Sequence, residues 1–457
     1  MPNIENEDWE KKVKKTKRRH RPYLGSNWSN ESFHSRFPKY VEQILSTPTP
    51  HLPSSANKLL TNIDCGTGPS GDGTAYPIYV DAGKISVQEF GERFEQHLVP
   101  AVICNIPTVE NWRASERWSD VYKWSQQRDN ENVSSDTLPL LNREFKCGES
   151  DHGNTLRLKL SHFLSYAHNN KDDSPLYVFD GTFDDDKASK TLLDDYSPPS
   201  FFQEDLFHLV GERRRPPYRW WLLGPERSGT TVHIDPLGTS AWNTLIVGKK
   251  RWVLFPPDTP KDVVKSKKLF LKSEDDEAVN YFCDLLPRLK EKHRDLQIYE
   301  FTQNPGDTLY VPSGWWHAVV NLTDTVAITQ NFCSRWNFDV VWRDARRGRK
   351  KMSVKWLDKL NSGAAGEVGK KLGRRAVELN ELDGFVMGGD DKKKEKEKEK
   401  EKKKKKGEKE KEKKKKKEGK REASKSVSVE RNKLKKSRKH SGTAAGTDYE
   451  KNGSESS

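Results

Sequence analysis

A series of short strand-forming segments, separated by glycine and proline, restricts the fold of this chain more than any other feature. Eight segments follow one another, all rich in β-branched and aromatic residues: YRWWLL (218–223), TTVHID (230–235), WNTLIV (242–247), KRWVLF (250–255), IYEFTQ (298–303), DTLYVP (307–312), HAVVNL (317–322) and TVAITQNF (325–332). Gly248–Lys249 and Pro305–Asp307 carry the turn residues of β-hairpins, so we expect hairpin turns there. Many short strands with such turns predict an antiparallel sandwich or small barrel.

Helical and polar segments flank these strands. A strand at YPIYV (76–80), a helix at SVQEFGERFEQHL (86–98) and a strand at PAVICNI (100–106) predict a strand–helix–strand opening. We therefore expect a mainly β fold with helical additions, divided into four parts. These are a basic and polar adaptor (1–76), the main domain (77–340, core strands about 217–334), a helical segment (341–388) and a tail (389–457).

The net charge of +14 belongs to the tail. The chain has 82 basic and 68 acidic residues, of which 28 basic and 14 acidic lie in 391–457, so the remainder is charge-balanced. The tail is a Lys/Glu repeat without Trp or Phe, and it cannot bury enough apolar surface to offset chain entropy. We expect it to be disordered.

Cysteine usage and hydropathy narrow the class of protein further. The five cysteines contain no Cys-x-x-Cys pair, which disfavours a disulfide scaffold and favours a reducing compartment. The N-terminus has no apolar signal region, and no apolar run reaches the roughly 20 residues of a membrane-spanning helix. We therefore do not expect a transmembrane receptor.

A metal site is predicted by His233 and Asp235 on one strand and His317 on a later one. Because side chains alternate along a strand, His233 and Asp235 share one face with Thr231. Two histidines and one carboxylate form the facial triad of non-haem Fe(II) oxygenases, which leaves positions open for cosubstrate and oxygen. Zinc-dependent hydrolysis remains a chemical alternative for the same ligands.

Three further residues would hold a cosubstrate. Lys250 begins the strand KRWVLF, and its cation can reach a carboxylate whose other end chelates the metal. Thr329, on a strand that follows His317, can share that carboxylate through its hydroxyl, and Asn243 can add an amide contact. A solvated hairpin lysine is the alternative for Lys250 taken alone.

The segments GPERSGTTVHIDPLGTSAWNTLIVGKKRWVLFPP (224–257) and PGDTLYVPSGWWHAVVNLTDTVAITQNF (305–332) closely resemble the jumonji-C oxygenases, and the resemblance spans roughly 78–355. It implies a double-stranded β-helix of the jelly-roll or cupin type. It also implies that His233, Asp235 and His317 bind iron, that Asn243, Lys250 and Thr329 bind 2-oxoglutarate, and that Thr230 and Trp220 line the pocket. The iron site itself would be catalytic, without a separate acid or base.

The same resemblance implies an Fe(II)- and 2-oxoglutarate-dependent dioxygenase that uses O2. Its substrates would be lysine, by hydroxylation, and methyl-arginine, by demethylation, in Arg/Lys-rich nuclear proteins such as histones and splicing factors. The alternative is a catalytically weak nuclear adaptor that binds RNA or chromatin. A lipid-binding receptor is a weaker rival, because no membrane span or lipidation motif supports it.

Three basic segments suggest where the protein works. They are KKVKKTKRRHR (11–21), RRGRKK (346–351) and RNKLKKSRK (431–439), and each suits nuclear localisation or contact with RNA phosphates. We expect a location in the nucleoplasm or nucleolus, with a share in the cytoplasm, and RNA binding without base specificity. The resemblance also suggests self-association into a homo-oligomer.

Overall fold

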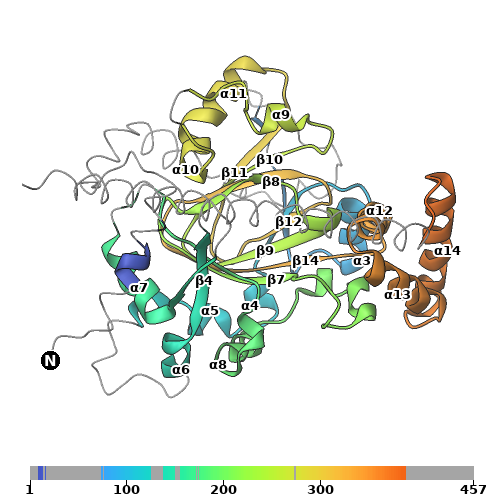
Figure 1. Ribbon diagram of the computed structural model, residues 1–457, viewed down its shortest axis with the longest axis horizontal. Helices are drawn as coiled ribbons and strands as arrows, with labels where there is room; N and C mark the ends of the chain where they lie inside the picture. The colour runs from blue at the N-terminus through green and yellow to red at the C-terminus, as the bar shows by residue number, and fades with distance from the viewer. Residues whose placement is uncertain are drawn as a thin grey trace, which may run out of the picture. The chain divides into compact units, whose positions relative to one another are not determined.

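The computed structural model describes residues 9–13, 16, 74–75, 77–124, 137–149, 155–170, 172, 174–271 and 274–387. The expectations of a disordered tail and of basic segments at 17–21 and 431–439 lie outside these residues. Two large sheets form the centre of the described fold (Figure 1). None of the described helices is long and apolar enough to cross a membrane.

The eight strands that the sequence predicts are divided between the two sheets. The five-stranded sheet contains, in spatial order, β1 (Thr74–Ala75), β11 (Ile298–Gln303), β10 (Lys250–Phe255), β13 (Trp316–Asn321) and β8 (Gly229–His233). The seven-stranded sheet contains β2 (Ile78–Asp81), β3 (Ala101–Cys104), β12 (Thr308–Val311), β9 (Ser240–Val247), β14 (Thr325–Phe332), β7 (Arg219–Gly224) and β6 (Val178–Asp180). A separate hairpin pairs β4 (Glu144–Glu149) with β5 (Thr155–Lys159).

Successive strands from β7 to β14 alternate between the two sheets, except that β10 and β11 pair in the same one. This winding is a double-stranded β-helix, so the predicted fold class is confirmed. The expected hairpin turns are wrong, because Gly248–Lys249 carries the chain from β9 to β10 in the other sheet, and Pro305–Asp307 carries it from β11 to β12. Gly248 and Gly306 both have positive φ, which suits a crossover as well as a hairpin.

The outer face of the seven-stranded sheet is buried under the N-terminal half of the described chain. The strand–helix–strand opening is confirmed: β2 and β3 pair in parallel at the sheet edge, joined by α3 (Val87–Phe90) and a short π-helix, η2 (Gly91–Glu95). Further helices follow: α4 (Ile106–Val109), α5 (Ala114–Arg117), α6 (Thr137–Asn142), α7 (Leu160–Asn169) and α8 (Lys187–Lys190). Apolar side chains of α4 to α7 form one core with Trp221, Trp242 and Tyr310 of the sheet.

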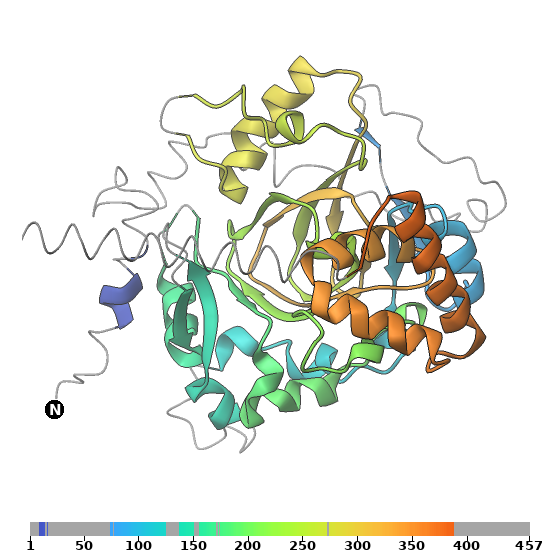
Figure 2. The same cartoon turned by 45° about the vertical axis from the view of Figure 1, so that its right-hand side comes forward.

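An insertion between β10 and β11 covers the outer face of the five-stranded sheet. It contains α9 (Lys261–Val264), α10 (Ala278–Asn280), the π-helix η9 (Tyr281–Leu285) and α11 (Leu286–Lys292), drawn in yellow-green to yellow in Figures 1 and 2. Beneath it the buried Glu300 accepts hydrogen bonds from Arg251 Nε at 2.7 Å and Lys290 Nζ at 2.5 Å. The insertion is therefore tied to the sheet by charge as well as by apolar packing.

Three C-terminal helices complete the described fold: α12 (Phe338–Gly348), α13 (Lys350–Asn361) and α14 (Gly366–Leu382), shown in orange to red in Figure 2. They share a buried apolar core, here called the C-terminal cluster, with Leu206, Phe207 and Val210 of η7 (Leu206–Val210). Its other buried members are Cys333, Phe338, Val341, Trp342, Ala345, Met352, Trp356, Leu360, Ala376 and Leu379. The helical segment expected at 341–388 thus packs on the main domain.

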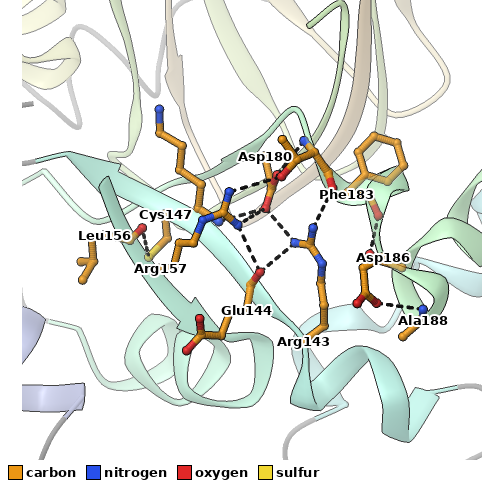
Figure 3. A network of polar contacts seen from close by, with 12 residues as sticks. Arg143, Glu144, Cys147, Leu156, Arg157, Asp180, Phe183, Asp186 and Ala188 are labelled. Carbon is orange, nitrogen blue, oxygen red and sulfur yellow. Dashed lines mark hydrogen bonds and ion pairs between the residues drawn. The ribbon is translucent and has the colours of Figure 1, made fainter. Parts of the chain in front are cut away.

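One buried carboxylate fixes the β4–β5 hairpin to strand β6 (Figure 3). Asp180 accepts hydrogen bonds from Arg143 Nη1 at 2.7 Å, from the Lys146 amide at 3.0 Å and from the Thr182 amide at 2.8 Å. Arg157 of β5 adds an ion pair at 3.3 Å. Burial alone would raise the pKa of Asp180, but these hydrogen bonds outweigh it and hold the pKa below its ordinary value.

Candidate functional site

The three predicted metal ligands converge between the sheets. One ligand atom from each of His233, Asp235 and His317 lies within 4.8 Å of the other two. His317 Nε2 is 3.9 Å from Asp235 Oδ1, and the two imidazole centroids are 4.2 Å apart. No other group of His, Cys, Asp and Glu in the described residues has this arrangement.

Backbone carbonyls fix the orientation of both histidines. His233 Nδ1 lies 2.8 Å from the carbonyl oxygen of Thr231, and His317 Nδ1 lies 3.1 Å from that of Trp315. A protonated Nδ1 donates in each contact, which leaves the lone pair of Nε2 for a metal. Burial, reinforced by neighbouring His233, lowers the pKa of His317 to about 4, so this ring is neutral near pH 7.

Asp235 is suited to a cation rather than to a hydrogen bond. Its Oδ2 atom is buried and has no hydrogen-bond partner, which is costly for a carboxylate without a counter-charge. A divalent metal would satisfy this atom together with the two Nε2 lone pairs. The set of two imidazoles and one carboxylate fits Fe(II) with open positions, and it also fits Zn²⁺.

Strand β8 departs from regular alternation next to these ligands. His317 pairs with His233, but Val319, two residues on, pairs with Thr230, so β8 carries an extra residue at a bulge. Thr230 therefore lies opposite Val319, whose side chain belongs to the core between the sheets. We expected Thr231 to share the face of the metal ligands because side chains alternate along a regular strand. The bulge interrupts that alternation, so this reasoning does not apply to Thr231.

Lys250 provides a buried cation deeper between the sheets. Its side chain is fully buried, and burial lowers its pKa to about 7. Within the described residues it forms no ion pair, and Nζ donates only to the hydroxyl of Tyr177, at 3.3 Å. A solvated hairpin lysine is thus excluded, and an anion is the partner that this ammonium lacks.

Lys250 and the metal ligands lie on the same face of the five-stranded sheet. Leu254 of β10 is the register partner of His317, and Lys250 lies four residues earlier, or roughly 13 Å along the strand. Asn321 of β13 pairs with Lys250, and its Oδ1 is buried without a partner. A dicarboxylate and the extended lysine side chain together can bridge this interval.

The remaining predicted residues form a row across the facing sheet. Thr329 of β14 pairs with Asn243 of β9 on one side and with Trp220 of β7 on the other. Asn243 Oδ1 is buried without a hydrogen-bond partner, whereas the Thr329 hydroxyl donates to the carbonyl of Trp242 at 2.7 Å. Thr329 must therefore turn its hydroxyl before it can donate to a bound carboxylate.

Sequence reasoning missed Tyr177 and Asn321, the buried polar neighbours of Lys250. Tyr177 lies 73 residues before Lys250, just ahead of β6, and no local pattern distinguishes it from a core tyrosine. Asn321 could have been found from strand pairing alone, because it is opposite Lys250 once β10 and β13 are placed side by side.

A double-stranded β-helix that holds two histidines and one carboxylate between its sheets defines the class of cupin-type metal-dependent oxygenases. Comparison with known proteins gives the family. Residues 220–332 match the family model described as "JmjC domain, hydroxylase". The chain belongs to the JmjC family of 2-oxoglutarate-dependent oxygenases, whose members depend on iron and 2-oxoglutarate.

Individual relatives agree with this assignment. The "Bifunctional arginine demethylase and lysyl-hydroxylase psr-1" of Caenorhabditis briggsae is 44% identical over 62% of this chain and 68% of its own length. The protein of the same name from Caenorhabditis elegans is 42% identical over 62% of this chain and 67% of its own length. The "Lysine-specific demethylase JMJ21" of Arabidopsis thaliana is 43% identical over 43% of this chain and 21% of its own length.

Proposed function

We propose that His233, Asp235 and His317 bind Fe(II), and that the enzyme oxidises lysine or methyl-arginine side chains of Arg/Lys-rich nuclear proteins. The observation that carries the metal assignment is the convergence of three ligand atoms with a buried, unpartnered Asp235 oxygen. The names of the two Caenorhabditis relatives support the substrate class. Intact ligands argue against the catalytically weak adaptor.

The protein's own residues would orient the cosubstrate. Lys250 would bind the far carboxylate of 2-oxoglutarate, with Asn243 and Thr329 beside it and Thr230 and Trp220 lining the pocket. Bound iron and 2-oxoglutarate would allow O2 to oxidise a C–H bond of the substrate, while 2-oxoglutarate is converted to succinate and CO2. The charge of Lys250 is desolvated before binding, so its attraction for a carboxylate is stronger than in water.

The position of the substrate carbon decides the outcome of this chemistry. Oxygen insertion at a lysine carbon gives hydroxylysine, whereas insertion at the N-methyl carbon of arginine gives a hemiaminal that releases formaldehyde. We favour lysyl hydroxylation, because it requires no prior modification of the substrate.

Mass spectrometry tests the proposal. Histone-tail and Arg/Ser-rich peptides, with and without methyl-arginine, are incubated with iron and 2-oxoglutarate, and we expect a gain of one oxygen atom on lysine. Formaldehyde release from methyl-arginine peptides would favour demethylation instead. His233→Ala is the control, and a product that persists in this variant would overturn the assignment of the iron site.

A nucleic-acid contact is a second candidate function, supported by α13. Lys351, Lys355 and Lys359 are exposed at four-residue spacing, so they line one face of this helix. Arg346 is not part of this surface: it is buried and binds Asn380 Oδ1 at 2.6 Å and the carboxylate of Asp383. The segment 346–351 is therefore only partly available for recognition by RNA or by a nuclear import receptor.

Salt dependence tests the nucleic-acid contact. Changing the three lysines of α13 to Gln should weaken binding of single-stranded RNA and reduce the slope of log K against log salt by about 2. Lys84, Lys187 and Lys190 are also exposed, and the same change there serves as the matched control. An unchanged slope in the α13 variant would contradict the proposal. Nuclear localisation and self-association remain proposals, and imaging and sedimentation measurements would test them.

A further inference from the structure

A left-handed turn follows the candidate metal ligand Asp235. The chain reverses over Pro236–Thr239, with the Thr239 amide 3.3 Å from the carbonyl oxygen of Pro236. Both central residues have positive φ, 59° at Leu237 and 62° at Gly238. Turns of this hand are normally built from Asn-Gly, Asp-Gly or Gly-Gly, because in this region Cβ crowds the following carbonyl oxygen; glycine has no Cβ, and the short polar side chains of Asn and Asp form local hydrogen bonds.

Leucine is an unfavourable residue for the first of these positions, so its side chain must be held by something else. Leu237 is half-buried and packs against the C-terminal cluster. Its Cδ2 atom lies 3.4 Å from where a Cβ on Gly348, the last residue of α12, would be. The Leu237 side chain therefore lies directly beside the C-terminal end of α12.

Helix α12 also contacts the second central residue of the turn. A Cβ on Gly238 would lie 2.8 Å from Val340 Cγ1, so the backbone of the turn is directly against the helix. On its other side the turn is tied to the loop before His317, because Ser313 Oγ donates to the carbonyl of Gly238 at 2.5 Å. The turn is therefore clamped between α12 and the chain that carries the other ligand strand.

The three candidate ligands differ in what orients them. Each histidine is held by a backbone carbonyl at Nδ1, but Asp235 Oδ2 has no hydrogen-bond partner. Asp235 lies beyond the end of β8 and directly precedes the turn. Its Oδ1 atom lies 3.9 Å from His317 Nε2, too far for a hydrogen bond, so the direction of the carboxylate depends on the backbone of the turn.

We propose that Leu237 is a positioning residue for Asp235, and that it couples the C-terminal helices to the affinity of the metal centre. This inference rests on the proposed function, since it concerns the same three ligands. The packing of Leu237 on the C-terminal cluster holds the left-handed turn, and the turn directs the Asp235 carboxylate toward His233 and His317. Loss of the anchor leaves the ligand present but misdirected.

Metal affinity is the appropriate measurement, with Mn²⁺ as an oxygen-stable probe and isothermal titration calorimetry on the full-length apo protein. Leu237→Ala removes the anchor. Leu237→Asn also removes it but suits the left-handed backbone, so it separates side-chain packing from backbone strain. Both variants should bind Mn²⁺ about tenfold more weakly, the loss typical of residues that orient a metal ligand. Leu237→Met, which keeps an apolar anchor, should bind Mn²⁺ with nearly wild-type affinity.

Leu372→Ala is the matched control, because Leu372 of α14 is another partly buried leucine packed on the C-terminal cluster. It should lower the thermal midpoint of the apo protein as Leu237→Ala does, yet leave the affinity for Mn²⁺ unchanged. If both Leu237→Ala and Leu237→Asn bound Mn²⁺ with wild-type affinity, the positioning role of Leu237 would be overturned, while the assignment of the metal ligands would stand. A wild-type protein that binds no Mn²⁺ would instead overturn the metal assignment.

Discussion

His233 and His317 face each other directly across strands β8 and β13 as register partners, with their rings inclined at 56°. Burial and the neighbouring His233 keep the pKa of His317 at about 4, so the pair does not have to accommodate two imidazolium charges near pH 7. Their Nε2 lone pairs then lie close to the Asp235 carboxylate, whose Oδ2 atom is buried without a hydrogen-bond partner. The arrangement is therefore suited to bind a cation.

Replacing Asp235 should affect metal binding far more than folding. Asp235→Ala removes a buried oxygen without a partner, so the free energy of unfolding of the apo protein should change by less than about 0.5 kcal/mol or increase. The rise in thermal midpoint that Mn²⁺ gives the wild type should disappear. Asp258→Ala, at an exposed position after β10, is the control and should keep the Mn²⁺ effect. A strongly destabilised apo Asp235→Ala protein would mean that this carboxylate is structural.

The affinity for 2-oxoglutarate should fall as the pH rises above 7. Burial lowers the pKa of Lys250 to about 7, so above this pH the free protein holds a neutral amine. A bound carboxylate favours the ammonium form and raises that pKa, so binding above pH 7 takes up a proton. The dissociation constant should then increase by up to about tenfold per pH unit, until the pH reaches the pKa of the complex.

Calorimetry of 2-oxoglutarate binding to the Mn²⁺-loaded protein measures this dependence. Titrations in buffers of different ionisation enthalpy would report the proton taken up. Lys250→Met removes the titrating group, so its weaker binding should not vary with pH. A wild-type dissociation constant that stays constant between about pH 7 and about pH 9 would contradict the assignment of Lys250 as the carboxylate ligand.

Gly181→Ala should disturb the pocket through Trp220. An added Cβ would lie 2.5 Å from Trp220 Nε1, and the rigid indole also packs against Phe179, whose ring centroid is 5.6 Å away. We expect a loss of about 1–3 kcal/mol in the free energy of unfolding, and weaker 2-oxoglutarate binding. In the control Gly83→Ala, on an exposed turn, the Cβ would lie 3.3 Å from Asp81 Oδ1 and 4.0 Å from Val109 Cγ2, so it would meet no rigid aromatic ring. Equal effects of both substitutions would exclude a specific role of Trp220.

Much of the site could be predicted from the sequence because its residues lie in regular strands. His233 and His317 fall in segments whose β-branched and aromatic composition indicates strands, and the resemblance to jumonji-C oxygenases supplied their roles. The position of Lys250 at the start of β10 was likewise predictable. What alternation could not show is the bulge in β8, because an extra residue leaves no mark in the hydrophobic pattern.

Contacts between distant segments could not be predicted from the sequence, because local patterns do not show which segments meet in the fold. Glycine turns look alike whether the next strand pairs with the previous one or crosses to another sheet, so the hairpin at Gly248 was predicted wrongly. Arg346 lies in a basic run that resembles a solvated surface, yet Asn380 and Asp383 of the last helical segment bury it. Tyr177 contacts Lys250 only because β6 joins the edge of the seven-stranded sheet.

The ion pair between Asp180 and Arg143 should be the strongest single anchor of β6 at the edge of the seven-stranded sheet (Figure 3). Both side chains are at least nine-tenths buried, so Asp180→Asn leaves the Arg143 guanidinium without its counter-charge. Removing one partner of a buried pair costs about 3–5 kcal/mol, whereas replacing both with apolar groups costs less. The double variant Asp180→Leu/Arg143→Met should therefore be more stable than the sum of the single substitutions predicts, as chemical denaturation would show.

The same pair predicts how stability depends on acid. The pKa of Asp180 is held below its ordinary value in the folded protein, so its contribution is complete above the unfolded-state pKa of about 4 and is lost as the pH falls further. Wild-type stability should then decline below about pH 4 more steeply than that of the double variant. Asp185→Asn, at an exposed position nearby, should follow the wild type. Parallel decline of the double variant and the wild type would show that other carboxylates govern the acid limb, and that Asp180 is not the anchor of β6.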